Sequence, residues 1–385
     1  METKLVSESN QSNGEKIGKE QTKEAQQLAT HCLQIITKFN FDHNRIFKIN
    51  ELSNQRIGVL LNNSLLIYNL KSFQILDEVK FPILDCNYDE GICDFIELKN
   101  TDLVLWSIKQ ILFYHLIENK YQLYQTINGL EEENKEKSID YGFYSRSSKK
   151  GEINSIYELS TGKLILCISS GLAVFTKINE EYKLESKHEI KIDVRRAIEI
   201  NENKLVLLQR YHYFFWGCSY NNFSSHTYLI STYDLETKQL TKLAENEVTK
   251  NDYYGYTSIS YLIKNGFLLI RYGNRIDIYD IKNNMTLVNH DQDTMVKHEE
   301  TYYGKYKLLK DDMDVIFLCE YFDDLILVKN FKVKDKAKIY MLKDNSISYV
   351  ADFPYELKGL AEIIKLKNNC FIMYSENQLV VLNKK

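Results

Sequence analysis

The sequence lacks three features that would each point to a class of protein. It contains no apolar run of about 18 residues, the length that a transmembrane helix needs, so we expect no transmembrane segment. Lys and Arg total 49 against 53 Asp and Glu, a formal net charge of -4, so the positive excess used in non-specific nucleic-acid binding is missing. We therefore expect no nucleic-acid partner. Proline is also scarce, at two residues, and we assign this scarcity no function.

The cysteines and the first residues indicate the compartment. Seven cysteines are present, an odd number without a CxxC pair, and the chain opens on charged and polar residues in place of an apolar signal core. Both features are typical of proteins in a reducing compartment. We therefore expect a cytoplasmic protein.

Common catalytic and ligand-binding motifs are missing as well. The sequence contains no GxSxG, GxxxxGK[ST] or GxGxxG pattern, the marks of a nucleophile elbow, a phosphate loop and a dinucleotide turn. His212, Cys218 and His226 fall within one predicted hairpin, but their separations match no common zinc site. Cys86 and Cys93 have no histidine nearby in the sequence and are expected to be free structural cysteines. We predict no catalytic residue, no metal site and no cofactor.

The residues that are present predict a polar arm followed by an all-β domain. Residues 1–29 hold few large apolar groups, so they cannot offset the entropy cost of ordering and are expected to form a flexible arm. From Thr30 to Lys385 the pattern changes to short apolar runs separated by Asn, Asp, Gly and Lys turns. This alternation is typical of strands joined by hairpins.

The strands belong to a repeated unit. A pair of strands joined by a polar turn recurs seven times, as in "ICDFIELKNTDLVLW" from Ile92 and "INSIYELSTGKLILCI" from Ile153. A third strand follows each pair, for example "ILFYHL" ending at Leu116, and a fourth follows in the first six units. Four strands, a to d, at a period of about 40 to 60 residues overlap the range of β-propeller blades.

The fourth strand that the seventh unit lacks is found near the start of the domain. "LQIITKF" (Leu33 to Phe39) reads like the outer strand "FQILDEVKF" of the first unit and precedes that unit. Pairing of this strand with the last unit would close a ring and remove exposed sheet edges. We therefore predict a seven-bladed β-propeller of four-stranded antiparallel blades, closed by an N-terminal strand that completes the last blade.

The domain resembles the WD40-type propellers. "TYDL" (Thr232 to Leu235) and "IYDI" (Ile278 to Ile281) match the end of that family's third strand, where an aromatic residue precedes Asp. The sequence departs from the family because it contains no Gly-His and no Trp-Asp pair, so the family's Asp-His-Ser/Thr-Trp network cannot be carried over. The resemblance implies architecture and a protein-interaction role, with no inherited binding residues.

Insertions are predicted on one face of the propeller. The a–b turns are short, whereas blade four has a long b–c connection and the link at residues 129–150 is the longest between blades. Blade six is expected to place strand a near Tyr303 and to insert Glu320 to Lys336 between strands b and c. Links and b–c connections share one face, and loops carry function more often than the scaffold. We expect the partner to bind this face.

The b–c connection of blade four is unusually aromatic. "LVLLQRYHYFFW" is expected to continue strand b past the usual turn, and "SHTYLISTYDL" to return as an equally extended strand c. One interpretation is structural, with the aromatic side chains packed against neighbouring blades or capping the hairpin. The other is a protein-binding protrusion, because Trp, Tyr and Arg dominate interface hot spots. The candidate partner-binding residues are Tyr211, Tyr213, Phe215, Trp216, Tyr220 and Phe223.

Two alternative functions rest on charged residues. "VRRA" (Val194 to Ala197) resembles the paired arginines of phosphoinositide-binding propellers but has Ala where their motif has Gly, so Arg195 and Arg196 are candidate lipid ligands. A propeller hydrolase or lactonase would place its site in the central channel. The carboxylates that end strand a are expected to be structural, turn-facing and solvated, because an enzyme site would break their symmetry: Glu51, Glu97, Glu158 and Glu199. We predict a non-enzymatic scaffold or adaptor that binds a protein partner, either by itself or as a subunit of a larger complex.

Overall fold

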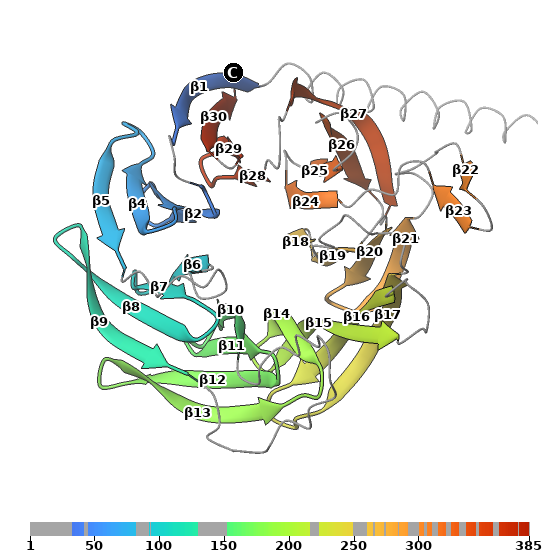
Figure 1. The fold of residues 1–385 in the computed structure, drawn as a ribbon, viewed down its shortest axis with the longest axis horizontal. Coiled ribbons are helices and arrows are strands. Elements are labelled where there is room, and N and C mark those ends of the chain that lie inside the picture. The colour runs from blue at the N-terminus through green and yellow to red at the C-terminus, as the bar shows by residue number, and fades with distance from the viewer. Residues whose placement is uncertain are drawn as a thin grey trace, which may run out of the picture. The chain divides into compact units, whose positions relative to one another are not determined.

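The computed structural model describes residues 33–41, 45–81, 92, 94–129, 152–215, 223–248, 260–264, 266–272, 275–283, 285–291, 300–303, 306–309, 315–320, 325–330, 336–343, 346–356, 362–375 and 377–384. They fall into two compact units, one spanning residues 43–250 and the other residues 1–42 with 251–385. Every regular element among them is a β-strand (Figure 1).

The unit at residues 43–250 contains four sheets, each of four strands in the order a to d. Blade one is β2 (Lys48–Leu52), β3 (Arg56–Leu60), β4 (Ser64–Asn69) and β5 (Ile75–Lys80). Blade two is β6 (Asp94–Glu97), β7 (Leu103–Trp106), β8 (Gln110–Ile117) and β9 (Lys120–Asn128). Blade three is β10 (Ile153–Glu158), β11 (Leu164–Ile168), β12 (Gly171–Ile178) and β13 (Glu181–Glu189). Blade four is β14 (Asp193–Asn201), β15 (Lys204–Phe215), β16 (Phe223–Asp234) and β17 (Leu240–Val248).

The other unit contains three four-stranded sheets and one hairpin. Blade five is β18 (Ser260–Lys264), β19 (Phe267–Tyr272), β20 (Arg275–Asp280) and β21 (Thr286–Asp291). The hairpin is β22 (Glu300–Tyr303) and β23 (Tyr306–Leu309). Blade six is β24 (Val315–Glu320), β25 (Leu325–Asn330), β26 (Lys336–Lys343) and β27 (Ser346–Glu356). Blade seven is β28 (Glu362–Lys365), β29 (Phe371–Tyr374), β30 (Gln378–Lys384) and β1 (Leu33–Asn40).

These sheets confirm the predicted fold class, an all-β, seven-bladed β-propeller of four-stranded antiparallel blades. The predicted completion of the last blade is also observed, because β1 pairs antiparallel with β30 from Leu33↔Lys384 to Asn40↔Gln378. The backbone N–H of Phe41 then donates to the carbonyl of Asn377 at 2.8 Å. Residues from the beginning and the end of the chain therefore form one sheet.

The prediction for blade six was wrong by one strand. The segment near Tyr303 forms the separate hairpin β22–β23, and strand a is β24 instead. The supposed insertion between Glu320 and Lys336 contains strand b itself, which pairs with strand c from Leu325↔Met341 to Lys329↔Ala337. Blade six therefore lacks the long b–c insertion, and the additional structure lies in the link from blade five.

Strands a to c are held by apolar packing between neighbouring blades. Phe95 of blade two, with no exposed surface, packs in one cluster with Leu60 and Leu65 of blade one. Gly58 on β3 permits this close approach, because a Cβ atom there would lie 2.6 Å from Cε2 of Phe95. Equivalent clusters join blade two to three, three to four, five to six and six to seven.

A β-bulge recurs at the outer edge of every blade. The register between strands c and d shifts near the end of strand c, so strand d carries one extra residue there. Bulges bend a strand and increase its twist. The acidic or amide residue after the strand-c aromatic then fixes the c–d turn: Asp234 Oδ1 accepts the N–H of Thr237 at 2.7 Å, and Asn69 Oδ1 that of Lys71 at 2.8 Å.

Candidate functional site

Blade four contains the extended hairpin that the sequence predicts. β15 and β16 are 12 residues each, whereas β11 and β12 of blade three have five and eight. They pair without a register shift from Lys204↔Asp234 to Phe215↔Phe223. β-branched and aromatic residues favour strands, and "LVLLQRYHYFF" consists mostly of such residues and leucine. The predicted continuation of strands b and c is confirmed.

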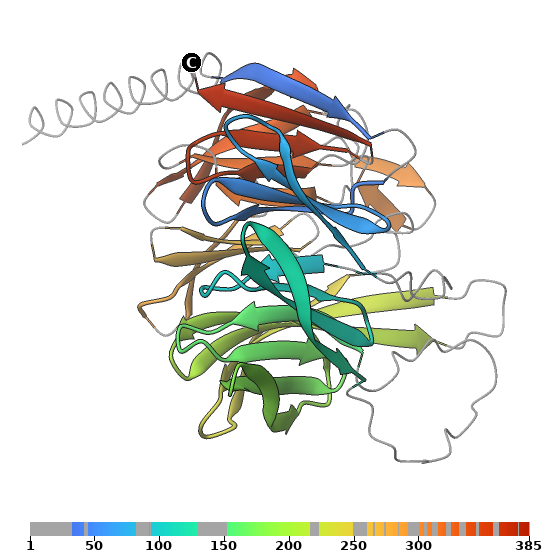
Figure 2. The same cartoon turned by 90° about the vertical axis from the view of Figure 1, so that its left-hand side faces the viewer.

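The far part of this hairpin extends past both neighbouring strands. β14 pairs with β15 as far as Asp193↔Arg210, and β17 pairs with β16 as far as Val248↔His226. Among the described residues, β15 beyond Arg210 is therefore paired with β16 alone. We call residues 211–215 and 223–227 the projecting ribbon; within it, His226 and Thr227 still pair with Val248 and Glu247 of β17. Figure 2 shows the yellow-green ends of these two strands reaching beyond the green strands of the same unit.

Four of the six predicted partner-binding residues lie in the projecting ribbon. Tyr211 is opposite Thr227, Tyr213 opposite Ser225, and Phe215 opposite Phe223. The structure describes their backbone. Trp216 and Tyr220 lie outside the described residues. The assignment of these six side chains to a partner contact stays a prediction.

The base of the hairpin is buried and hydrogen-bonded. Leu205 to Leu208 have no exposed surface, and Leu205 and Leu207 pack in one cluster with residues of blade three. Gln209, also fully buried, accepts a hydrogen bond at Oε1 from the Ser231 hydroxyl at 2.9 Å, across the pair of strands. Side chains at the base therefore hold the two strands in a fixed relation before they leave the blade.

A histidine joins the base to the outer strand of blade three. His188 on β13 is 7% exposed; its Nδ1 lies 2.8 Å from the Tyr233 hydroxyl and its Nε2 lies 2.9 Å from the Ser186 hydroxyl. Burial, with a smaller repulsion from Lys238, lowers the pKa of His188 below its ordinary value. Burial likewise raises the pKa of Tyr233. The neutral forms of both side chains are therefore favoured at this seam.

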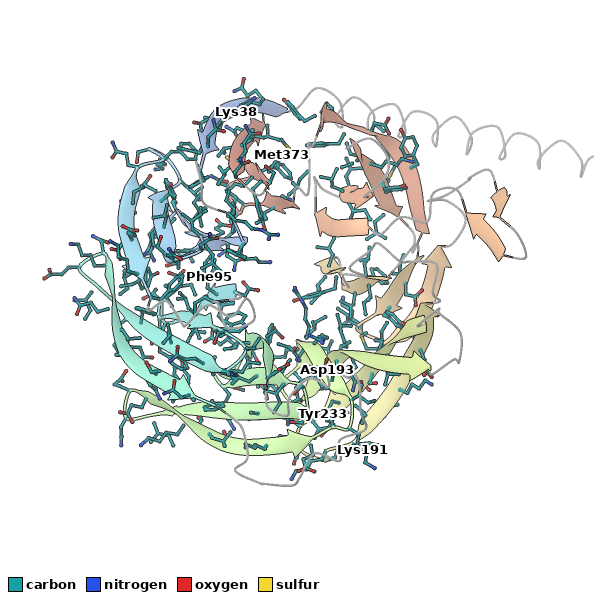
Figure 3. All side chains as sticks on the ribbon, viewed as in Figure 1. Lys38, Phe95, Lys191, Asp193, Tyr233 and Met373 are labelled. Atoms are coloured by element: carbon teal, nitrogen blue, oxygen red, sulfur yellow. The ribbon has the colours of Figure 1, made fainter. Side chains whose placement is uncertain are left out.

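A charged cluster lies where β14 begins. Asp193, whose side chain is 9% exposed, lies 2.6 Å from the Arg195 guanidinium and accepts a hydrogen bond from the Asn154 amide at 2.7 Å. Arg195 also donates to Asn154 Oδ1 at 2.9 Å, and its side chain stays 37% exposed. Arg196 and Lys191 are exposed. Figure 3 labels Asp193, Lys191 and Tyr233 in blade four and the segment leading into it.

These contacts place the two candidate lipid-binding arginines. Both lie on the innermost strand of blade four, and Arg195 is held by a neighbouring carboxylate and amide. β14 begins at Asp193, which pairs with Arg210, the last residue of β15 before the projecting ribbon. The same end of blade four therefore carries exposed positive charge and the extended hairpin.

The recurring strand-a carboxylates lie at the opposite end of the blades and act as structural links. Three of the four accept a hydrogen bond from the a–b turn of the preceding blade: Glu97 from the N–H of Ser53, Glu158 from that of Lys99 at 2.8 Å, and Glu199 from that of Ser160 at 2.7 Å. For these three the prediction that they face turns is correct, and for Glu51 it stays a prediction. They are less solvated than predicted, since burial raises the pKa of Glu158 and the Glu97 side chain is 7% exposed.

One acidic centre was not singled out by the sequence. Asp102, which is buried, lies 2.7 Å from His115 Nδ1 and 3.3 Å from Lys177 Nζ, and accepts a hydrogen bond from the Tyr124 hydroxyl at 3.1 Å. The His115 and Tyr124 rings stack with centroids 3.6 Å apart. Because Lys177 belongs to blade three and the others to blade two, the carboxylate links two blades. Its residues are scattered from 102 to 177, so no local motif could reveal it.

Other types of site are not found in the part of the chain that the structure describes. No group of three or more His, Cys, Asp or Glu side chains is arranged to hold a metal ion there. Those residues also include no helix long and apolar enough to cross a membrane.

Comparison with known proteins gives a likeness of structure without one of sequence. No family model and no curated protein matches this chain. A chain of a mitotic checkpoint complex superimposes with a TM-score of 0.57 at 8% identity, covering 91% of each chain. The extracellular domain of BT4673 from B. thetaiotaomicron superimposes with a TM-score of 0.54 at 11% identity, covering 90% of this chain and 43% of that one.

The shared property is the fold. A third match is the WD40 domain of SCAP from fission yeast, with a TM-score of 0.49 at 10% identity over 91% of this chain and 97% of that chain. The seven four-stranded sheets show the predicted propeller architecture, and the chain of the mitotic checkpoint complex shares this fold. At these identities the likeness assigns no partner and no activity.

Proposed function

We propose that this propeller is a non-enzymatic interaction platform of the cytoplasm, which binds a protein partner through the projecting ribbon and the adjoining links between blades. The observation that carries the proposal is the hairpin β15–β16, which continues beyond both of its neighbouring strands. A strand that only completes a blade has no need of this extension. The buried base at Gln209 and Ser231 supports the ribbon on a rigid scaffold, as binding surfaces require.

The composition of the ribbon supports a protein partner. Tyr and Trp are enriched among residues that dominate protein–protein binding, because they bury a large area at a small entropic cost. Five aromatic residues occur between 211 and 216: Tyr211, Tyr213, Phe214, Phe215 and Trp216. The likeness to a chain of a multiprotein complex agrees with such a role and assigns none.

The test is affinity purification of the tagged chain from its own cells, followed by mass spectrometry. Because Arg210 and Tyr228 are directly opposite, an Asn-Gly turn joining them should replace the ribbon and leave the rest of the blade paired, except that Glu247 and Val248 at the end of β17 lose their partners. We expect a defined set of proteins to be lost with the ribbon. The control replaces Thr237 to Gln239, in the c–d turn of the same blade, with Gly and Ser. Equal recovery by both variants and wild type, with unchanged thermal unfolding, would contradict the proposal.

A further inference from the structure

The projecting ribbon has a strand edge without a partner among the described residues on each side, a short one at residues 223–225 of β16 and a longer one at residues 211–215 of β15. Residues 211–215 of β15 pair with β16, and β14 ends its pairing at Arg210. In an antiparallel sheet the N–H and C=O groups of successive residues point alternately to the two sides of a strand. Alternate residues of this segment therefore direct backbone donors and acceptors to the side that β14 occupies lower in the blade.

This edge lacks the features that protect the outer strands of the same unit. Native proteins discourage pairing at strand edges with charged residues, proline or bulges. β13 carries Lys183, Glu185 and Lys187 and contains a bulge, β5 and β17 are also charged and bulged, and β9 has a bulge and one lysine. Residues 211–215, "YHYFF", contain no lysine, acidic residue or proline, and the β15–β16 register is regular. The unprotected edge is suited to accept a further strand.

Charged residues next to this edge, at the start of β14, indicate which kind of segment would bind. Lys191 and Arg196 are exposed and Arg195 is partly exposed, whereas the Asp193 carboxylate is covered by Arg195 and Asn154. The exposed charges of residues 191–196 at the start of β14 are therefore positive, and the nearest exposed carboxylate in sequence, Glu189, ends β13 of blade three.

We propose that the edge of β15 at residues 211–215 binds an extended segment of a partner protein by strand addition, with an acidic residue at the segment's C-terminal end. A segment antiparallel to β15 continues the line of β14, so its C-terminal end meets Lys191, Arg195 and Arg196. Backbone pairing supplies affinity and the carboxylate supplies orientation. A second copy of β15 would place Trp216 and Gly217 at this end, and neither carries a carboxylate. This inference rests on the proposed function and names its mode of binding.

The probe is a set of decapeptides selected from a random library on the full-length chain and then synthesised with a fluorescent label. We expect the selected peptides to be rich in β-branched and aromatic residues, with Asp or Glu near the C-terminus. N-methylation of alternate peptide residues distinguishes binding by backbone pairing from binding by side chains alone. If the backbone pairs, methylation in one phase weakens binding about tenfold or more, while methylation in the other phase leaves it nearly unchanged.

Variants of the chain locate the contact. Lys191→Glu and Arg196→Glu should each weaken binding about fivefold, whereas the control Lys183→Glu on β13 should have no effect. Replacing the ribbon with the Asn-Gly turn should abolish binding. Failure to select any peptide, equal effects of the two methylation phases, or equal binding to the ribbon-free chain would overturn strand addition. A concentration-dependent dimer that is lost with the ribbon would also overturn it, in favour of a second copy as occupant.

Failure of this inference is distinguishable from failure of the platform. If partners are lost with the ribbon in cells but the selected peptides show no phase dependence, the platform stands and strand addition is wrong. If phase-dependent peptide binding occurs but no cellular protein depends on the ribbon, strand addition stands as a property of the edge and the platform is wrong.

Discussion

The strand-a carboxylates show that equivalent residues can differ in their contribution to stability. Glu97, Glu158 and Glu199 make the same contact with the preceding turn. Only Glu97 is also paired with a buried guanidinium, that of Arg56 at 2.7 Å, where the two side chains are 7% and 5% exposed. Removing one partner from a buried ion pair leaves the other charge without compensation, which is far more costly than loss of an exposed pair.

We therefore expect unequal effects of the same substitution at two repeat positions. Glu97→Gln keeps the shape of the side chain but leaves Arg56 buried without its counter-charge, so the free energy of unfolding should fall by about 3 kcal/mol. Glu199→Gln, whose contacts are exposed, should cost less than about 1 kcal/mol. Urea unfolding of both variants measures the difference. Equal losses would show that the burial of the Arg56–Glu97 pair is unimportant.

At the scale of the element, the sequence was informative where local pattern decides the structure. The strand pairs of blades two and three have short polar turns between apolar runs, and their boundaries were readable. Blade six was misassigned because "YKLL" in β23 has the same alternation as a blade strand, and only pairing with other strands separates them. The recurrent strand-d bulges were not predicted either, because a bulge is defined by the pairing of strand d with strand c.

The seam between β13 and β16 should make stability depend on pH. The folded chain lowers the pKa of His188, chiefly by burial, so the unfolded chain takes up its proton first as pH falls. The contribution is complete above the unfolded pKa of about 6.5 and is lost progressively as pH falls below it. Unfolding by urea from about pH 7.5 to about pH 5 should show decreasing stability, with a shallower slope for His188→Gln. Identical slopes would rule out His188 as the titrating group.

At the scale of the molecule, the repeated sequence pattern made the architecture predictable but did not reveal the contacts between particular blades. Seven units of similar pattern predicted the number of blades and the use of Leu33 to Phe39 as a closing strand. The ribbon was predictable from the sequence because blade four departs from the repeated pattern. The contact of Asp102 with Lys177 was not predictable, because the two residues belong to different blades and only the packing of the blades brings them together. The candidate site was thus predictable as a segment, and Arg195 was identified from the sequence, whereas the pairing of Arg195 with Asp193 and Asn154 is visible only in the structure.

Completion of blade seven by β1 should be essential to the stability of that blade. A chain beginning at Phe41 lacks β1, so β30 loses its antiparallel partner from Lys384 to Gln378 and becomes an exposed edge. At about 1 kcal/mol for each lost hydrogen bond, the truncation should cost several kcal/mol and promote aggregation. A chain beginning at Thr30 retains β1 and should unfold at the temperature of the full chain. A synthetic peptide of Leu33 to Asn40 should partly restore the shorter chain. Equal unfolding temperatures for the two truncated chains would show that the last blade is stable with three strands.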